Sequence, residues 1–436
     1  MLIALLCTLA AGCSSPSGAR RDATRARDGG TDSRRPADAL DAAASRQDRG
    51  SSDALAPHDA SNADATRRRD AAAAEARADG GADAELACAA RRPAIVPASY
   101  PLLAGTALRV TAVAGGASSG ATDGSGGEAR FHEPRGLASD GAGTLYVSEC
   151  QNHLLRRVEV ATWRVTTLAG GALQAGSLDG TGGAARFRCP SDLAVADGIL
   201  YVADTDNSTI RRVNLGTREV TTLVGKAGEP GSADGPFADA RLNHPSGIAA
   251  RGELLWVADS GNHTLRRLDL RAGEVTTVAG TAGVPGLVDG AAGAARFYGP
   301  RGLSTDGSSL YVADSGNNAV RRLELASGVV STLAGGGPAF AYGDGSWDQA
   351  RFFAPIKLVV DGGVLWLADT NNRVIRRLDL LACSVSTPAG TAGVADGVDG
   401  VGMAARFSWP EGLVRVSQGL VVADMLSHRL RLLETP

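Results

Sequence analysis

The chain has 436 residues, a formal net charge of −3 and only 4% aromatic residues. This length allows one large domain and an appendage, and the balanced charge excludes the strongly basic surface that is typical of nucleic-acid binding. Glycine reaches 57 residues, which favours many tight turns between short strands over long helices. We therefore expect an all-β fold.

The first 13 residues resemble a bacterial secretion signal that ends in a lipobox. The apolar run Leu2-Ile3-Ala4-Leu5-Leu6 precedes Ala10-Ala11-Gly12-Cys13. In such a signal Cys13 is acylated and becomes the mature amino terminus. The alternative is an ordinary cleaved signal, because no basic residue precedes the run and Ala10 stands where the motif prefers Leu. The run is shorter than the roughly 20 apolar residues of a transmembrane helix.

Residues 14–94 are expected to form a disordered tether. From Ser14 to about Leu86 the segment is rich in Ala, Asp, Arg, Ser and Gly and has no aromatic residue. It cannot bury enough apolar surface to offset the entropy of ordering. A flexible coil of about 75 residues has a mean reach on the order of 50 Å, enough to hold a domain clear of a membrane.

Residues 95–436 contain six copies of a unit of about 55 residues. Each copy has an Asp-Gly pair, an apolar residue three positions before a proline, and an acidic residue after the proline. Such a fixed period is the sequence pattern of a repeat architecture. The six prolines are Pro134, Pro190, Pro245, Pro300, Pro355 and Pro410.

One copy predicts four short strands. The runs 302–305, 310–313, 319–325 and 329–334 are rich in Val, Leu and Tyr and are separated by turn residues. Four strands joined by hairpins make one blade of a β-propeller. The sequence therefore predicts six four-stranded antiparallel blades.

The order of the copies predicts how the ring closes. The chain ends at Pro436 after three strands of the last copy, whereas a matching fourth strand, Val110-Thr111-Ala112-Val113, precedes the first copy. Strand 109–115 should therefore complete the last blade by pairing with residues 428–433. This closure removes the free edges of the sheets.

The repeat resembles the NHL repeat. The similarity is carried by Pro245-Ser246-Gly247-Ile248 and by the run WVADSGNHTLRR from Trp256 to Arg267, and it extends over residues 109–436. The resemblance implies a six-bladed propeller that acts as an interaction platform. Some relatives bind RNA or proteins, and a few are enzymes, including a zinc-dependent amidating lyase.

Residues that recur in every copy are assigned structural roles. The acidic residue after the second strand and the Asn three positions later are expected to bond the hairpin backbone. One Arg of each Arg-Arg pair is expected to pair with an acidic residue of a neighbouring blade. We interpret the Asp-Gly loops as turns, because each has too few carboxylates for calcium.

Ligand-binding residues are expected where the repeat is uneven. Positions just after each proline should line one mouth of the central channel, and they differ between copies. The alternative is a solvated rim without a ligand. The residues are Arg135, Ser191, Asp192, Ser246, Arg301, Ile356, Lys357 and Glu411.

Extra aromatic residues form the second irregularity. Tyr342, Trp347 and Phe353 lie close together in a chain that is poor in aromatic rings, and Trp409 occupies the corresponding crossing of the next copy. Exposed rings beside a channel favour recognition of sugars, peptides or proteins. The alternative is a small local core beneath a long loop.

The sequence offers little for catalysis. The histidines are scattered over different copies, no closely spaced metal-ligand pair exists, and neither a nucleophile elbow nor a phosphate loop is present. We therefore assign no catalytic residue, no metal and no cofactor. The alternative is a lactonase-like, metal-dependent hydrolase or lyase whose ligands converge at the channel mouth.

In an exported chain disulfides are expected. Cys150 follows the second strand of the first blade and Cys189 precedes Pro190 of the second, so these two form the first expected pair. Cys88 and Cys383 form the second.

Together these features predict an exported, lipid-anchored propeller that faces the periplasm or the cell surface. We expect a monomer that binds a protein or glycan of the cell envelope and does not bind nucleic acid.

Overall fold

The structure is a computed structural model that describes residues 88, 91–93, 98, 103, 107–337 and 341–436. The expected signal at 1–13, including Cys13, and almost all of the expected tether lie outside these residues. Within the described part, no helix has the length and apolar character needed to cross a membrane.

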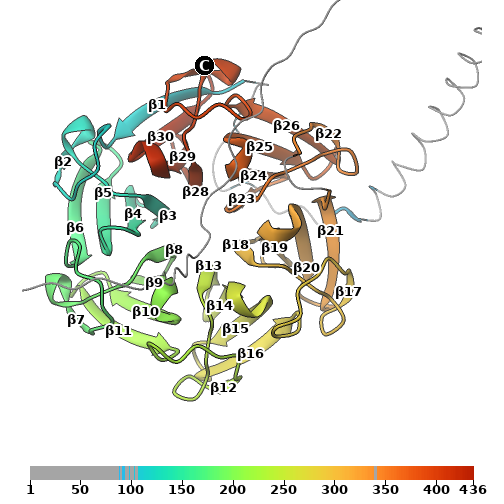
Figure 1. Cartoon of the computed structure of the whole chain (residues 1–436), viewed down its shortest axis with the longest axis horizontal. Helices are drawn as coiled ribbons and strands as arrows, with labels where there is room; N and C mark the ends of the chain where they lie inside the picture. The colour runs from blue at the N-terminus through green and yellow to red at the C-terminus, as the bar shows by residue number, and fades with distance from the viewer. Residues whose placement is uncertain (1–87, 89–90, 94–97, 99–102, 104–106, 338–340) are drawn as a thin grey trace, which may run out of the picture. The chain divides into compact units, whose positions relative to one another are not determined.

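Six antiparallel sheets are arranged as blades around a central channel, as Figure 1 shows. The predicted all-β, six-bladed propeller is therefore confirmed. Each blade has four main strands, which follow one another from the channel outward. Blade one contains β3 (Pro134–Ser139), β4 (Thr144–Glu149), β5 (Leu154–Glu159) and β6 (Arg164–Gly170). Blade two contains β8 (Pro190–Ala196), β9 (Ile199–Asp204), β10 (Thr209–Asn214) and β11 (Glu219–Val224). Blade three contains β13 (Pro245–Arg251), β14 (Leu254–Asp259), β15 (Thr264–Asp269) and β16 (Glu274–Ala279).

The remaining blades follow the same order. Blade four contains β18 (Pro300–Thr305), β19 (Ser309–Asp314), β20 (Ala319–Glu324) and β21 (Val329–Gly335). Blade five contains β23 (Leu358–Asp361), β24 (Val364–Asp369), β25 (Val374–Asp379) and β26 (Ser384–Ala389). Blade six contains β28 (Pro410–Val416), β29 (Gly419–Asp424), β30 (Arg429–Glu434) and β1 (Arg109–Ala114).

Each sheet has a fifth strand at its outer edge, so the prediction of four strands per blade is wrong by one. The extra strand has only two residues, and it contains the Gly of the Asp-Gly pair that the sequence analysis assigned to a turn. As the chain crosses between blades, this segment pairs briefly with the outermost main strand of the next blade. These strands are β2 (Gly124–Ser125), β7 (Gly180–Thr181), β12 (Gly235–Pro236), β17 (Gly290–Ala291), β22 (Gly345–Ser346) and β27 (Gly400–Val401).

Short 3-10 helices occur at two kinds of position. Three follow a fifth strand: η1 (Gly126–Glu128), η2 (Gly182–Ala184) and η7 (Gly402–Ala404). Five form the hairpin between the second and third strands: η3 (Thr205–Asn207), η4 (Ser260–Asn262), η5 (Ser315–Asn317), η6 (Thr370–Asn372) and η8 (Met425–Ser427).

The ring closes as predicted, through a strand from the amino-terminal side of the repeats. Strand β1 pairs antiparallel with β30, with Val110 opposite Leu433. The observed bounds of both strands differ by about one residue from the predicted bounds. The first and last strands of the propeller therefore lie side by side in one sheet, which leaves no unpaired edge between them.

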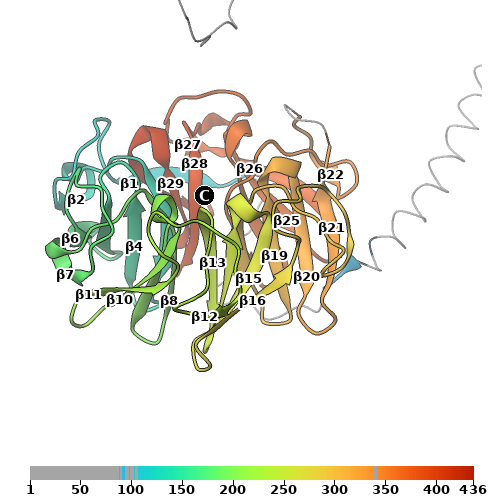
Figure 2. The same cartoon turned by 60° about the horizontal axis from the view of Figure 1, so that its bottom comes forward.

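The core lies between neighbouring blades. Every residue of β9 is buried, because both faces of a middle strand are covered by an adjacent sheet. Between blades one and two, for example, Phe187 packs in one cluster with Leu155 and Leu200. Figure 2, turned by 60° from Figure 1, shows the strands of neighbouring blades lying side by side around the ring.

A buried ion-pair network is repeated in all six blades. In blade three, Arg266 is fully buried, and its guanidinium contacts Asp259 Oδ2 at 2.7 Å and Asp234 Oδ1 at 2.6 Å. Asp234 directly precedes β12, so both partners belong to the arginine's own blade. The expectation of a partner from a neighbouring blade is therefore wrong. The six arginines are Arg156, Arg211, Arg266, Arg321, Arg376 and Arg431.

The acidic residue of this network has its pKa raised by burial. For Asp204 the pKa rises to about 6, because desolvation outweighs the nearby charge of Arg211 and the hydrogen bonds that the carboxylate accepts. One of these bonds comes from Asn207, three residues along the chain, and another comes from the backbone N–H of Arg188. The acid therefore organises the hairpin as well as pairing with the arginine.

Two disulfides are present. Cys150 is bonded to Cys189 across the junction of blades one and two, and Cys88 is bonded to Cys383 of blade five. Arg91 also contacts blade five, through an ion pair with Asp348 at 2.9 Å. Residues 88 and 91 thus contact the propeller although they precede the expected domain start at residue 95.

Candidate functional site

A polar cavity of about 250 Å3, which we call the mouth cavity, lies where the innermost strands begin. The hairpins between second and third strands surround the same end of the channel. All eight positions that the sequence analysis placed at the mouth line this cavity: Arg135, Ser191, Asp192, Ser246, Arg301, Ile356, Lys357 and Glu411. Because each blade supplies one or two of them, residues separated by up to 276 positions, from 135 to 411, meet in one site.

Asp192 and Lys357 form an ion pair across the channel. Lys357 Nζ lies 2.5 Å from Asp192 Oδ2, and both side chains are about nine-tenths buried. Blades two and five lie on opposite sides of the six-bladed ring (Figure 1). Asp192 Oδ2 also accepts a hydrogen bond from the backbone N–H of Ile248 at 2.9 Å, whereas its Oδ1 is buried without a partner. The pair therefore buries a carboxylate beside the cavity, with one oxygen that has no hydrogen-bond partner among the described residues.

The same two residues replace a glycine of the repeat. The other four blades have Gly at the second position after the proline, because the innermost strands approach one another closely there. A Cβ at Gly247 would lie only 1.7 Å from the carbonyl oxygen of Arg301. Blades two and five instead carry oppositely charged side chains three blades apart, a pattern that the sequence analysis did not recognise as a pair.

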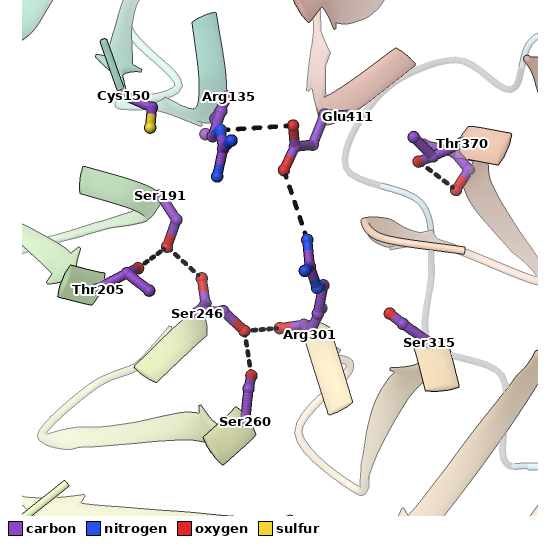
Figure 3. A network of polar contacts seen from close by, with 12 residues as sticks. Arg135, Cys150, Ser191, Thr205, Ser246, Ser260, Arg301, Ser315, Thr370 and Glu411 are labelled. Atoms are coloured by element: carbon purple, nitrogen blue, oxygen red, sulfur yellow. Dashed lines mark hydrogen bonds and ion pairs between the residues drawn. The ribbon is translucent and has the colours of Figure 1, made fainter. Parts of the chain in front are cut away.

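Glu411 is the second buried carboxylate of the cavity. Its side chain is only 7% exposed, and it lies 3.7 Å from Arg135 Nε and 4.0 Å from Arg301 Nη1 (Figure 3). Burial raises the pKa of Glu411, and the charges of Arg135 and Arg301 only partly oppose this shift. Arg135 Nε has no hydrogen-bond partner among the described residues. These long contacts leave hydrogen-bonding capacity for a ligand.

Hydroxyl groups line the opposite side of the cavity. Ser191 Oγ lies 2.6 Å from Thr205 Oγ1 and donates to the carbonyl oxygen of Ser246 at 2.9 Å, and Ser246 Oγ contacts Ser260 (Figure 3). The mouth cavity therefore combines hydroxyls, three carboxylates, two guanidiniums and the ammonium group of Lys357 around a small volume.

Thr205 and Ser260 were not identified from the sequence, although their position is regular. In blades two to five the residue after the second strand has a hydroxyl that donates to the proline carbonyl of the next blade, as Thr370 does to Pro410 at 2.7 Å. In blade one this position is Cys150, which forms the disulfide to the neighbouring blade. The sequence signal is a column of the repeat: Cys150, Thr205, Ser260, Ser315, Thr370 and Met425.

The expected aromatic ligand surface is not assembled at the mouth. Trp347 is only 1% exposed and belongs to the core of blade five, so its selection as a ligand-binding ring is corrected. Tyr342 is 46% exposed, but its ring lies over Arg376 and its hydroxyl contacts Thr387, so its contacts lie on the outer strands of blade five. Phe353 is half-buried and does not line the mouth cavity.

Among the four aromatic candidates, Trp409 is the one that borders a depression adjoining the mouth cavity. It is half-buried and lines a depression of about 370 Å3 together with Arg301 and Ile356, which also line the mouth cavity. The local core that the sequence analysis weighed as an alternative explains Trp347, whereas Trp409 remains next to the site.

No group of three or more His, Cys, Asp or Glu side chains with metal-binding geometry occurs among the residues that the structure describes. Among the described residues that line the mouth cavity, His244 is the one histidine. Of the carboxylates at the mouth, Asp192 pairs with Lys357, and Glu411 lies near Arg135 and Arg301.

The NHL-repeat model matches residues 187–212 and 242–268. The chain is 31% identical over 303 residues to NHL repeat-containing protein 2 of Gallus gallus, and 29% identical over 307 residues to the chloroplastic protein SUPPRESSOR OF QUENCHING 1 of Arabidopsis thaliana. These alignments cover 61% and 66% of this chain but only 41% and 29% of the relatives. The chain is therefore a six-bladed β-propeller that contains matches to the NHL repeat.

Solved structures share this fold at low sequence identity. A protein of unknown function from Bacteroides thetaiotaomicron aligns with a TM-score of 0.59 and 22% identity, over 75% of this chain and 76% of that chain. An auxiliary nutrient binding protein from the same organism aligns with a TM-score of 0.55 and 17% identity, over the same shares of the two chains.

Proposed function

We propose that this protein is a binding module that holds a small polyhydroxylated ligand, such as a saccharide of the cell envelope, in the mouth cavity. The observation that carries this proposal is the combination of Glu411, Arg301 and the Ser191–Thr205 hydroxyls around a cavity of about 250 Å3. A cavity of this size accommodates a small molecule or the end of a chain and excludes a folded domain.

The chemistry of the lining supports a saccharide. A sugar ring presents neighbouring hydroxyls that both donate and accept, and the cavity is lined by hydroxyls of Ser191, Thr205 and Ser246 and by the guanidiniums of Arg135 and Arg301. Trp409 borders the adjoining depression, where a ring or an aglycone could stack on the indole. The name of the nutrient-binding neighbour agrees with this class of function.

The proposal includes export and a lipid anchor at Cys13, with residues 14–94 as a tether between the membrane and the propeller. Expression of the full chain in a bacterial host with radiolabelled palmitate tests this part. We expect label in the wild-type chain and none in Cys13→Ala. Label that persists in Cys13→Ala would contradict the anchor.

The binding site is tested by calorimetric titration of the full chain with a panel of neutral and acidic saccharides. We expect Arg301→Ala to weaken the best ligand about tenfold or more, equivalent to about 1.4 kcal/mol. Arg301 is half-exposed, so this change should leave the fold intact. Tyr342→Ala, which removes an exposed ring outside the mouth cavity, is the matched control and should bind normally.

Two outcomes would overturn the proposal: no saccharide binds the folded chain, or Arg301→Ala binds as well as the wild type. If instead Tyr342→Ala alone loses binding, the ligand site lies on blade five and not at the mouth. Metal analysis of the purified chain, together with a lactone-hydrolysis assay, tests the metal-dependent enzyme as the alternative.

A further inference from the structure

A second and larger cavity, which we call the interblade cleft, lies between blades three and four. It has a volume of about 780 Å3, within the range of small-molecule sites. It is bordered by the hairpins that contain Gly252, Gly307 and Gly328, which join first to second and third to fourth strands. These hairpins lie at the end of the strands opposite the mouth cavity, so the two sites are separate.

The floor of the cleft is apolar. Leu254, Val278 and Leu325 are partly exposed and pack against a core cluster that contains the buried side chains of Trp256 and Leu323. The position that corresponds to Trp256 in blades one, two and four is a tyrosine, and in blade four the hydroxyl of Tyr311 donates to Asp306. Trp256 has no hydroxyl, and its indole makes no hydrogen bond among the described residues. Trp256 therefore adds to the apolar character of the cleft lining.

Two guanidinium groups stand beside this apolar floor. Arg267 is directly opposite Trp256 in the β14–β15 register, and its Nε is buried without a hydrogen-bond partner. Arg251 lies at the rim, where Gly307 leaves room for it, and it bonds only the backbone carbonyl of Asp306. Neither arginine has a carboxylate within ion-pair distance among the described residues.

The neighbouring blade shows how such an arginine is otherwise satisfied. Arg322 of blade four, at the position equivalent to Arg267, bonds Ser309 through Nε and pairs with Glu324 at 3.4 Å. In blade three the acid two residues after the arginine is Asp269, but its Oδ1 accepts hydrogen bonds from the backbone N–H groups of its own hairpin. In blade five the equivalent Asp379 accepts the same hairpin bonds and also pairs with Arg377 at 3.1 Å, whereas no ion pair joins Asp269 to Arg267. Arg267 is thus a partly buried cation without an ion-pair partner among the described residues, and such a group favours an external anion.

We propose that the interblade cleft binds an amphipathic small-molecule carboxylate. Its aromatic or alicyclic body packs on Leu254, Val278 and Leu325, and its carboxylate accepts hydrogen bonds from Arg267, with Arg251 closing over it at the rim. A planar guanidinium beside an apolar wall suits a carboxylate that is attached directly to a hydrophobic ring. This site does not depend on the ligand of the mouth cavity.

Calorimetric titration of the full chain with 2-naphthoate, and with the uncharged 2-naphthamide as a matched body, tests the proposal. We expect saturable binding of naphthoate, with the amide about tenfold weaker or more, because only the carboxylate satisfies the guanidiniums. Arg267→Met should remove this preference. Arg322→Met is the control, since that arginine is already paired and lies outside the cleft.

Arg251→Ala guards against a folding artefact, because this exposed side chain can be removed without disturbing the core. A clear loss of naphthoate affinity in this variant supports the site. The proposal is overturned if wild-type protein does not bind naphthoate, if the amide binds equally well, or if both cleft variants bind like Arg322→Met.

Discussion

Ion pairs are arranged differently inside the blades and at the channel mouth. Inside the blades, six fully buried arginines each pair with two acidic residues of the same blade, and the arrangement recurs from blade to blade. At the mouth, charged residues of different blades pair with one another, and no pairing recurs. The difference teaches that ion pairs repeated in every blade stabilise the fold, whereas charged residues that occur once, around a single cavity, are candidates for ligand binding.

The largest effect on stability is expected from removing one arginine of the buried ion-pair network. Arg266→Ala leaves Asp259 buried without its cationic partner and should lower the free energy of unfolding by about 3–5 kcal/mol. Burial already holds the pKa of Asp259 above its usual value, so the cost should be greatest at neutral pH and shrink in acid as that carboxyl is protonated. Urea unfolding measures this. The exposed Arg271→Ala is the control, and an equal loss in both variants would contradict the network's role.

A smaller loss is expected from breaking the cross-channel pair at the mouth. Lys357→Met leaves the buried carboxylate of Asp192 without its cationic partner and should lower the free energy of unfolding by about 2–4 kcal/mol. Adding Asp192→Asn should recover most of this loss, because the double variant no longer buries an unpaired charge. Denaturant unfolding of the two single variants and the double variant gives the coupling. Additive losses would show that the two side chains act independently.

The smallest effect has the opposite sign. Burial raises the pKa of Glu411, so between its unfolded value and its folded value the unfolded chain ionises more readily, and wild-type stability falls as the pH rises through this window. Glu411→Gln should therefore stabilise the protein by about 1 kcal/mol near pH 7 while weakening ligand binding. Thermal unfolding should show no advantage near pH 4. A destabilised variant at pH 7 would mean that the two arginines stabilise the carboxylate more than burial destabilises it.

Much of this architecture could be predicted because a repeat reports each structural requirement six times. The prolines gave the blade count, and the displaced Val110 strand gave the closure onto β30. The ring of mouth residues followed from the same register, since the position after each proline must fall at the same end of each inner strand. Whether this ring binds a ligand stays a prediction.

Other features were missed because they depend on contacts that local patterns do not encode. The two-residue fifth strand is too short to show a period and exists only by pairing with a neighbouring strand. Trp347 looked like a surface ring in an irregular loop, yet it packs beneath that loop against the core of blade five. Arg376 of the same blade finds its second carboxylate in Asp344, within its own sheet.

The sequence by itself determined the blade, the number of blades and the closing strand, because each depends on apolar strand runs and turn residues that recur along the chain. Only the tertiary structure decided that Asp192 meets Lys357, that Arg135 and Arg301 flank Glu411, and that Arg267 lacks the partner that Arg322 has. The contacts at the mouth are distances between blades, and they exist only once the ring has closed and brought residues far apart in the chain to a common centre. The difference between Arg267 and Arg322 depends on side-chain geometry within each blade, which the shared Arg-x-acid pattern does not encode.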